Sequence, residues 1–355
     1  MQPDSIDFRS DNCASVRPDV LAALAAANEG TAASYGDDEL SIELNKVYSA
    51  LFEHPVHVFP VATGIAANAL SVACLTPPYG SVYVHETAHL QNSECGASEF
   101  YTGGAKLMPL RTGHPKLDAP SLATALAGAG KGNPHKIQPA TLSLTQATDL
   151  GVSYSPAEVK ALTAVAREHG LGVHMDGARF ANALVFHGAT PAEMTWRSGV
   201  ELLSFGATKN GVMNTEAVVC FDAKYAEVLN YRRLRAGLVW SKMRFAAAQL
   251  LAYVEGGRWL ETARWANAGA SRIGAAIAKL PLASLAAPIE ANEVFVDMPE
   301  SALSGLEAAG VKFFRMGPLR ARFVCRWNVT DAEIDRLISL LNSLCAATPA
   351  QAAAQ

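Results

Sequence analysis

The feature that most constrains the fold is an alternation of short apolar runs with helical patterns between residues 56 and 221. Amphipathic or alanine-rich stretches, including 64–75 and 155–169, separate several of these runs. Strands that alternate with helices are typical of a mostly parallel sheet covered on both faces. The chain is therefore predicted to be an α/β protein with a three-layer α/β/α large domain. The runs predicted as buried strands are 56–60, 81–84, 140–145, 171–175, 200–205 and 217–221.

The alternation of predicted strands and helices ends after residue 222. A mainly helical region (224–280) leads to strand-like runs at 294–298, 312–314 and 322–327 and to a last helix, which predicts a small α+β C-terminal domain. Capping boxes that begin at Ser155 and Thr330 mark two helix starts. We expect the tail 346–355 to fray. The predicted divisions are an N-terminal segment (1–30) that contributes to the active site, a large domain (31–250) and a small domain (251–355).

Charge and composition argue against several classes of protein. The net charge is −4, with no basic block, so the chain lacks the electrostatic pattern of a nucleic-acid-binding protein. No apolar run approaches the roughly 20 residues that span a bilayer, and the polar N-terminus has no apolar signal region. The six cysteines form no C-x-x-C pair. These observations predict a cytoplasmic protein that binds neither nucleic acid nor membrane.

One lysine stands in an unusual setting. The stretch SFGATKNG (204–211) places Lys209 among small residues just beyond a predicted strand. Ligands of open α/β sheets bind outside the carboxyl ends of the strands, and small neighbours allow close approach to the amine. A lysine that forms a Schiff base needs this access. A solvated loop lysine produces the same pattern, so the octapeptide needs supporting residues.

Two further strand ends supply such residues. HMDGAR contains Asp176 and Arg179, which have two possible roles. Asp176 is either a helix N-cap, with Arg179 as a surface cation, or the carboxylate that keeps a pyridine nitrogen protonated, with Arg179 as a neighbouring cation. Thr63 and Gly64 precede a helix of small residues, which is a suitable phosphate site. Tight packing of that helix on the sheet explains the same residues equally well.

The string HETAH places His85 and His89 after another predicted strand. It matches a zinc-protease helix signature. A protease of this kind needs a third ligand and a long helix, whereas this segment follows a strand. An imidazole that stacks on a flat cofactor fits the position better. We therefore predict no metal site and keep a zinc hydrolase as an alternative.

Taken together, the motifs resemble those of the low-specificity L-threonine aldolase family. These are pyridoxal-phosphate enzymes of the aspartate-aminotransferase-like fold (fold type I). The resemblance implies retro-aldol cleavage of L-threonine, L-allo-threonine and related β-hydroxy-α-amino acids, including phenylserine-like ones, to glycine and an aldehyde. The motifs that carry it are DFRSDN (7–12), YGDD (35–38), ATGIAANAL (62–70), ETAHLQNSECGA (86–97), HMDGARFANA (174–183) and SFGATKNG (204–211).

The resemblance also implies which residues hold the cofactor. Lys209 would be the Schiff-base lysine, and Asp176 would pair with the pyridine nitrogen. Arg179 would lie near the phenolic oxygen and the substrate. His89 would stack on the ring. The phosphate would lie at the helix start, within reach of Thr63, Gly64 and Ile65.

For the substrate, the family pattern implies that Ser10 and Arg322 hold the amino-acid carboxylate, Arg322 through a planar two-point contact. His89 is the candidate base for the β-hydroxyl, with His85 or a bound water as substitutes. Members of the family pair across their active sites. Tyr35 and Lys242 are therefore expected to reach a neighbouring subunit's site in a homo-oligomer, at least a dimer and by expectation a tetramer.

Two positions depart from the family pattern. Ile65 replaces a threonine that contacts the phosphate in many aldolases, a loss that Lys242 of another subunit can compensate. Thr148 and Asp149 stand where some relatives carry a histidine that faces the substrate hydroxyl. The base, the preference between threonine and its allo epimer, and the preferred aldehyde stay open. The alternatives are a β-eliminating lyase or an amino-acid racemase on the same fold, the zinc hydrolase, and a non-catalytic interaction protein.

Overall fold

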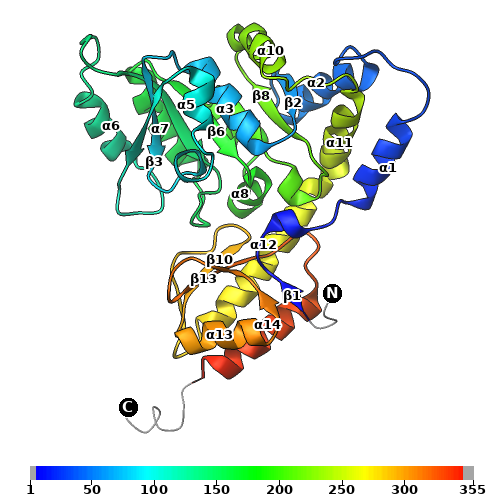
Figure 1. The fold of residues 1–355 in the computed structure, drawn as a ribbon, viewed down its shortest axis with the longest axis vertical. Coiled ribbons are helices and arrows are strands. Elements are labelled where there is room, and N and C mark those ends of the chain that lie inside the picture. Colours follow the sequence, from blue (N-terminus) through cyan, green and yellow to red (C-terminus); the bar gives the residue numbers. More distant parts are fainter. Residues whose placement is uncertain (1–4, 347–355) are drawn as a thin grey trace.

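A seven-stranded sheet forms the centre of the larger part of the molecule in this computed structural model, which describes residues 5–346 (Figure 1). The strand order is β2-β8-β7-β6-β5-β3-β4. β8 is antiparallel to both of its neighbours, and the other pairs are parallel. The carboxyl ends of β2 to β7 therefore share one edge. The strands are β2 (His57–Val61), β3 (Gly80–His85), β4 (Lys106–Leu110), β5 (Gln138–Thr145), β6 (Gly172–Gly177), β7 (Leu202–Phe205) and β8 (Glu216–Cys220).

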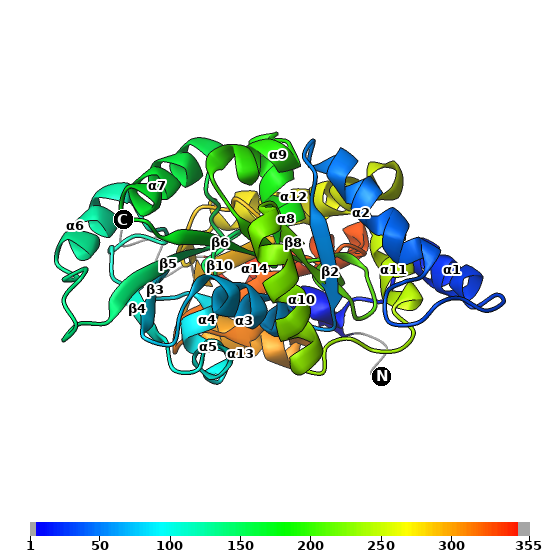
Figure 2. The same ribbon diagram turned by 90° about the horizontal axis from the view of Figure 1, so that it is seen from above.

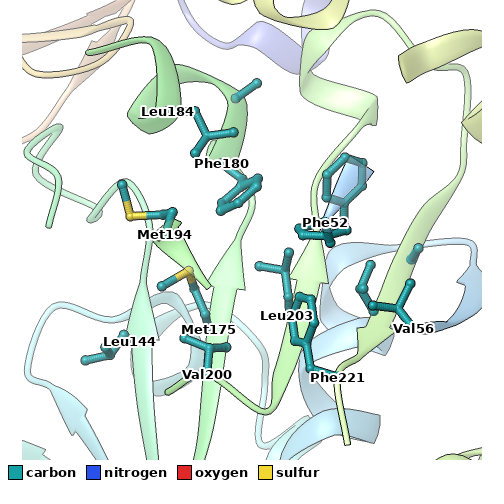
Figure 3. Close-up of a cluster of buried hydrophobic side chains, with 14 of the residues drawn as sticks. Phe52, Val56, Leu144, Met175, Phe180, Leu184, Met194, Val200, Leu203 and Phe221 are labelled. Carbon is teal, nitrogen blue, oxygen red and sulfur yellow. The ribbon is translucent and has the colours of Figure 1, made fainter. Parts of the chain in front are cut away.

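Helices cover both faces of this sheet (Figure 2). α3 (Gly64–Leu75) and α10 (Ala226–Arg235) lie on one face, and α7 (Pro156–Glu168) and α9 (Pro191–Met194) lie on the other. Successive side chains of a strand point to opposite faces. Leu202 accordingly packs with Leu70 of α3, whereas Leu203 packs with Phe180 in the larger core cluster (Figure 3). Burial on both faces explains why these strands read as continuous apolar runs.

The remaining helices of the larger part surround the sheet. α1 and α2 pack against α11 at the end of the molecule beside β2 (Figures 1 and 2). Their bounds are α1 (Pro18–Ala27), α2 (Glu39–Leu51), α4 (His89–Asn92), α5 (Ala97–Thr102), α6 (Ala119–Ala127), α8 (Phe180–His187) and α11 (Arg244–Val254). Short 3-10 turns are η1 (Asp11–Cys13), η2 (Trp196–Ser198), η3 (Thr208–Asn210), η4 (Ala223–Tyr225) and η5 (Glu255–Gly257).

The smaller part has an antiparallel sheet of its own, with the order β12-β13-β10-β9. The long helix α12 runs into it from the larger part (Figure 1). The N-terminal strand β1 pairs with β11, and Phe8 is buried in the core of the smaller part. The bounds are β1 (Ile6–Asp7), α12 (Arg258–Ile277), β9 (Ser284–Leu285), β10 (Glu293–Asp297), α13 (Glu300–Ala308), β11 (Val311–Lys312), β12 (Phe314–Arg315), β13 (Arg320–Val324) and α14 (Asp331–Leu344).

Most of the predicted elements are present, including the mostly parallel sheet and both capping boxes. The prediction missed β4, whose Pro109 argues against a strand, although proline is tolerated in an edge strand such as this one. The run 312–314 was wrong as one strand, because β11 ends at Lys312 and β12 begins at Phe314. The predicted domain boundaries stay a prediction. Most of the tail 346–355 lies outside the described residues. Within residues 5–346, no helix combines the length and apolar character that crossing a bilayer requires.

Candidate active site

A cavity of about 310 Å³ opens at the carboxyl edge of the large sheet, where the segments that follow β2, β3, β5, β6 and β7 meet. Most of the residues predicted from the strand ends line it. These are Thr63, Gly64, Ile65, His89, Asp176, Arg179 and Lys209. The wall also includes side chains that were not assigned a role from the sequence, among them Asn12, Asn68, Asp149 and Glu216. Loops distant in the chain therefore form one site.

Lys209 lies in η3, directly after β7. A Cβ on Gly206 would lie 2.5 Å from the backbone oxygen of Ala178, so only glycine lets this loop pass so close to the end of β6. Asn210 fixes the turn through its side-chain amide, which donates to Tyr253 Oη (3.0 Å) and to the carbonyl of Trp259 (2.8 Å). Within residues 5–346 the Lys209 ammonium forms no hydrogen bond or ion pair. The small residues of SFGATKNG thus expose a free amine to the cavity.

Asp176 lies at the end of β6 and is 3% exposed. Its Oδ1 accepts the backbone N–H of Ala178 (3.1 Å), and its Oδ2 accepts the Asn68 side-chain amide (3.0 Å). The same Asn68 nitrogen donates to Glu94 Oε1 (2.8 Å). Asn68 comes from α3 and is buried, so it connects the helix at the predicted phosphate site to two carboxylates. The sequence did contain a signal for Asn68: it follows Gly64 of ATGIAANAL by one helical turn, so the two residues lie on the same face of the helix.

The first turn of α3 has the features of an anion site. Thr63 caps the helix and accepts the N–H of Ala66 (3.1 Å). The structure shows no acceptor among residues 5–346 for the backbone N–H groups of Gly64 and Ile65. A Cβ built on Gly64 would meet nothing within 4 Å, so the space beside it is open. Free amides and the positive end of the helix dipole favour a phosphate at this position.

His89 begins α4, and its Nδ1 donates to Glu94 Oε1 (2.9 Å). Glu94 has a fully buried side chain. The hydrogen bond to Glu94 raises the pKa of His89 above its ordinary value, although partial burial opposes the change. Burial also raises the pKa of Glu94 itself, against the hydrogen bonds from His89 and Asn68. Glu94 therefore fixes the orientation of the imidazole and favours its protonated form.

His85 does not line the cavity. Its Nε2 donates to the carbonyl of His114 (2.8 Å), and its Nδ1 accepts from the Thr87 hydroxyl (2.8 Å). Both ring nitrogens are thus engaged, which leaves no lone pair for a substrate proton. His85 is the last residue of β3 and His89 the first of α4, so the HETAH string is not one helix. In the described part of the chain, no three His, Cys, Asp or Glu residues are grouped to hold a metal ion.

Arg179 lines the cavity and lies between two acids, Asp11 and Glu293. Its Nε donates to Asp11 Oδ2 (2.8 Å), and its Nη1 lies 3.2 Å from Glu293 Oε2. Burial alone would lower the pKa of Arg179, but the charges of Asp11 and Glu293 raise it. Burial would likewise raise the pKa of Asp11, yet Arg179 and Lys209 lower it. A side chain from the N-terminal segment is thereby tied into the site.

Four predicted residues lie elsewhere. Ser10 and Arg322 do not line the cavity, although Asn12, two residues after Ser10, does. Arg322 Nη1 lies 3.8 Å from Oε1 of Glu293, the acid that also pairs with Arg179. Tyr35 is 59% exposed, and its N–H donates to the carbonyl of Ser241 (3.0 Å), next to the exposed Lys242. Tyr35 and Lys242 thus share one surface, separate from the cavity of their own chain.

A lysine and a buried aspartate at the carboxyl edge of such a sheet, beside a helix start with free amides, define the class of fold type I pyridoxal-phosphate enzymes. A model of the beta-eliminating lyase family matches residues 7–301. The low specificity L-threonine aldolase of Pseudomonas sp. (strain NCIMB 10558) is 39% identical over 98% of this chain and 100% of its own length. The Pseudomonas aeruginosa protein of the same name is 40% identical over 95% of this chain and 96% of its own.

A solved structure of Leishmania major threonine aldolase has the same fold, with a TM-score of 0.90 at 23% identity over 96% of this chain and 99% of that one. The chain belongs to the beta-eliminating lyase family and, within it, to the low-specificity L-threonine aldolases. The predictions of family, fold class, threonine aldolase function, lyase activity and cofactor are thereby confirmed. The roles of individual residues stay predictions.

Proposed function

We propose that the cavity around Lys209 is the active site of a pyridoxal-phosphate-dependent aldolase. It cleaves L-threonine, L-allo-threonine and related β-hydroxy-α-amino acids, including phenylserine-like ones, to glycine and an aldehyde. The observation that carries the proposal is one cavity that brings together the Lys209 amine, the buried Asp176 carboxylate and the N-terminal amides of α3. Among residues 5–346, neither this amine nor the amides of Gly64 and Ile65 have a partner. When bound, the cofactor supplies an electron sink for the bond that breaks at Cα.

The residues present fit this cofactor. Lys209 would hold its aldehyde carbon, since its ammonium has no other partner in the described chain. Asp176 would hold the pyridine nitrogen, because each of its oxygens accepts one hydrogen bond and retains a lone pair. The amides of Gly64 and Ile65 would hold the phosphate. His89, whose imidazole is oriented by Glu94, would stack on the ring.

Arg179 and Arg322 supply the positive charge for an amino-acid carboxylate. We assign the direct contact to Arg322 together with Ser10. Arg322 is only weakly engaged by Glu293, at 3.8 Å, and its buried Nε has no acceptor within residues 5–346. Arg179, by contrast, donates two hydrogen bonds to Asp11 and forms a closer ion pair with Glu293, at 3.2 Å. A two-point contact with the substrate carboxylate would replace this long ion pair and the hydrogen bond from Arg322 Nη2 to the carbonyl of Arg9 (3.4 Å).

Replacement of Lys209 by alanine tests the assignment of the site. We expect the purified variant to lose the visible absorbance band of the lysine-bound cofactor and to release neither glycine nor acetaldehyde from L-threonine. A Lys160→Ala variant, altered at an exposed lysine of α7 that does not line the cavity, should keep both the band and the turnover. A Lys209→Ala protein with an unchanged band and normal turnover would place the chemistry elsewhere.

A second activity deserves a direct assay because the matching family model is named for β-elimination. A β-eliminating lyase or a racemase would use the same lysine, aspartate and phosphate site, and would differ in the bond at Cα that is aligned for breaking. Measuring pyruvate and ammonia beside acetaldehyde and glycine from one preparation separates the lyases. Loss of optical activity without either product would identify a racemase.

The exposed surface around Tyr35 and Lys242 supports a homo-oligomer in which these residues complete a neighbouring site. Mixed subunits test this arrangement. A Lys209→Ala subunit supplies an intact Lys242, and a Lys242→Ala subunit supplies an intact Lys209. If Lys242 acts across the interface, hybrids of the two should regain up to about half of wild-type activity per dimer. Hybrids no more active than the Lys242→Ala protein alone would place Lys242 in its own subunit's site or outside any site.

A further inference from the structure

The segment that follows β5 brings an acidic side chain to the cavity that the assigned roles do not use. Asp149 lines the cavity together with His89 and Asp176. Its Oδ2 is enclosed, and within residues 5–346 it has no hydrogen-bond partner. Buried carboxylates normally have donors, because an unpaired one is costly. Of the other acids that line the cavity, Asp176 accepts two donors, and Glu216 accepts the N–H of Ala207 (2.6 Å). The nearby Glu293 also has no hydrogen-bond donor among residues 5–346, but it lies 3.2 Å from Arg179 Nη1.

The loop that carries Asp149 is held rigidly, so the unpaired carboxylate is not a consequence of a loose turn. The Thr148 N–H donates to the carbonyl of Val152 (2.8 Å), and the Gly151 N–H donates back to the carbonyl of Thr148 (2.9 Å). At the far end, the Ser153 N–H donates to Glu290 Oε2 (2.7 Å), which ties the loop to the smaller part of the molecule. The backbone therefore fixes Asp149 at the cavity and leaves its carboxylate free.

We propose that Asp149 is the general base that takes the proton of the substrate's β-hydroxyl; this inference rests on the aldolase function proposed above. The O–H bond breaks and its proton passes to a carboxylate oxygen of Asp149. The electron pair of that bond becomes the second C–O bond of the aldehyde, and the pair of the Cα–Cβ bond remains with Cα. Cα later gains one proton to become glycine, so the reaction as a whole neither releases nor consumes protons.

The electrostatics of the cavity suit Asp149 to this role better than His89. Burial, helped by the charges of Asp176 and Glu293, raises the pKa of Asp149 to about 6, against the opposing charges of His89 and Arg179. A base is most effective when its pKa lies near the working pH. The hydrogen bond from Nδ1 to Glu94 raises the pKa of His89 and so favours the protonated imidazole, which cannot accept a further proton. A cationic imidazole beside Asp149 instead stabilises the ionised carboxylate.

The charged groups around Asp149 set the expected pH dependence. Asp176 and Glu293 oppose its ionisation from β6 and β10, while His89 on α4 and Arg179 after β6 favour it. Only the ionised carboxylate accepts a proton. The cleavage rate of the wild type should therefore fall as the pH drops below about 6, whereas an Asp149→Asn variant should lack this acid limb. A His89→Asn variant should keep an acid limb, shifted to higher pH because loss of the neighbouring cation raises the pKa of Asp149.

Two reactions of the same holoenzyme separate this role from a structural one. Cleavage of L-threonine needs the β-hydroxyl base, whereas exchange of the glycine α-proton in heavy water does not. For Asp149→Asn we expect a loss of cleavage of about 100-fold or more, with glycine exchange within about threefold of the wild type and an unchanged visible cofactor band. An exposed Asp335→Asn variant, which makes the same chemical change in α14, should alter neither reaction.

Three outcomes would overturn the proposal. The first is cleavage of L-threonine by Asp149→Asn within a few-fold of the wild-type rate. The second is an equal loss of exchange and cleavage in this variant, which would assign Asp149 to cofactor binding or to folding. The third is an acid limb that disappears in His89→Asn and persists in Asp149→Asn, which would make His89 the base. Failure of the wild type to release any aldehyde would instead refute the aldolase function.

Discussion

Asn68 offers the sharpest test of how this site is stabilised. Its side-chain nitrogen donates to Asp176 Oδ2 at 3.0 Å and to Glu94 Oε1 at 2.8 Å, and the residue is 2% exposed. Asn68→Ala removes the donor from two buried carboxyl groups at once and brings no water-accessible replacement. Each acceptor left short of a donor costs about 1–3 kcal/mol. The free energy of unfolding should therefore fall by roughly 2–5 kcal/mol, allowing for partial relaxation around the smaller side chain.

The assay is urea unfolding of the cofactor-free chain, followed by a cofactor titration. The titration should show weaker binding, because Asp176 loses the partner that orients its carboxylate. The matched control is Asn182→Ala, since Asn182 donates to Asn267 Oδ1 (2.8 Å), a neutral acceptor outside the cavity. A neutral hydrogen bond contributes only about 0.5–1.5 kcal/mol, so this variant should lose less stability and bind the cofactor normally. Equal losses in the two variants, or a change below about 0.5 kcal/mol in Asn68→Ala, would refute the reasoning.

Three further outcomes follow from the same geometry. Arg322→Leu should raise the apparent KM for the amino acid about tenfold or more with a smaller change in kcat; an unchanged KM would assign the carboxylate to another cation. Gly206→Ala should lower the free energy of unfolding by about 1–3 kcal/mol and weaken the cofactor band, because its Cβ would lie 2.5 Å from the Ala178 oxygen. Asp11 has a pKa held below its unfolded value by Arg179 despite burial, so its stabilisation is present above about pH 4 and lost at lower pH. Asp11→Asn should therefore differ most from the wild type near neutrality in unfolding experiments, and a difference that grows toward pH 3 would contradict this.

Local pattern was sufficient for much of the fold because a strand buried on both faces and a capped helix have signals that lie within a few residues. The strand before Lys209 and the capping box at Ser155 are examples. The direction of a buried strand leaves no such trace, so β8 could not be distinguished from its parallel neighbours. β4 was missed because it contains Pro109. A strand tolerates proline when it lies at the edge of a sheet, and the position of β4 at the edge is decided by the whole sheet.

The sequence by itself determined which loops could form a site, because strand ends, glycine-rich turns and helix starts place Lys209, Asp176 and Gly64 at one edge of a parallel sheet. Only the tertiary structure decided which polar side chains face that site. The sequence predicted His89 as the base and His85 as its substitute. In the structure, Thr87 and the carbonyl of His114 occupy both ring nitrogens of His85, which does not line the cavity. Asp149 likewise became a candidate base only because its enclosed Oδ2 lines the cavity without a donor among residues 5–346. Such environments are built from segments far apart in the chain, and no short stretch of sequence encodes them.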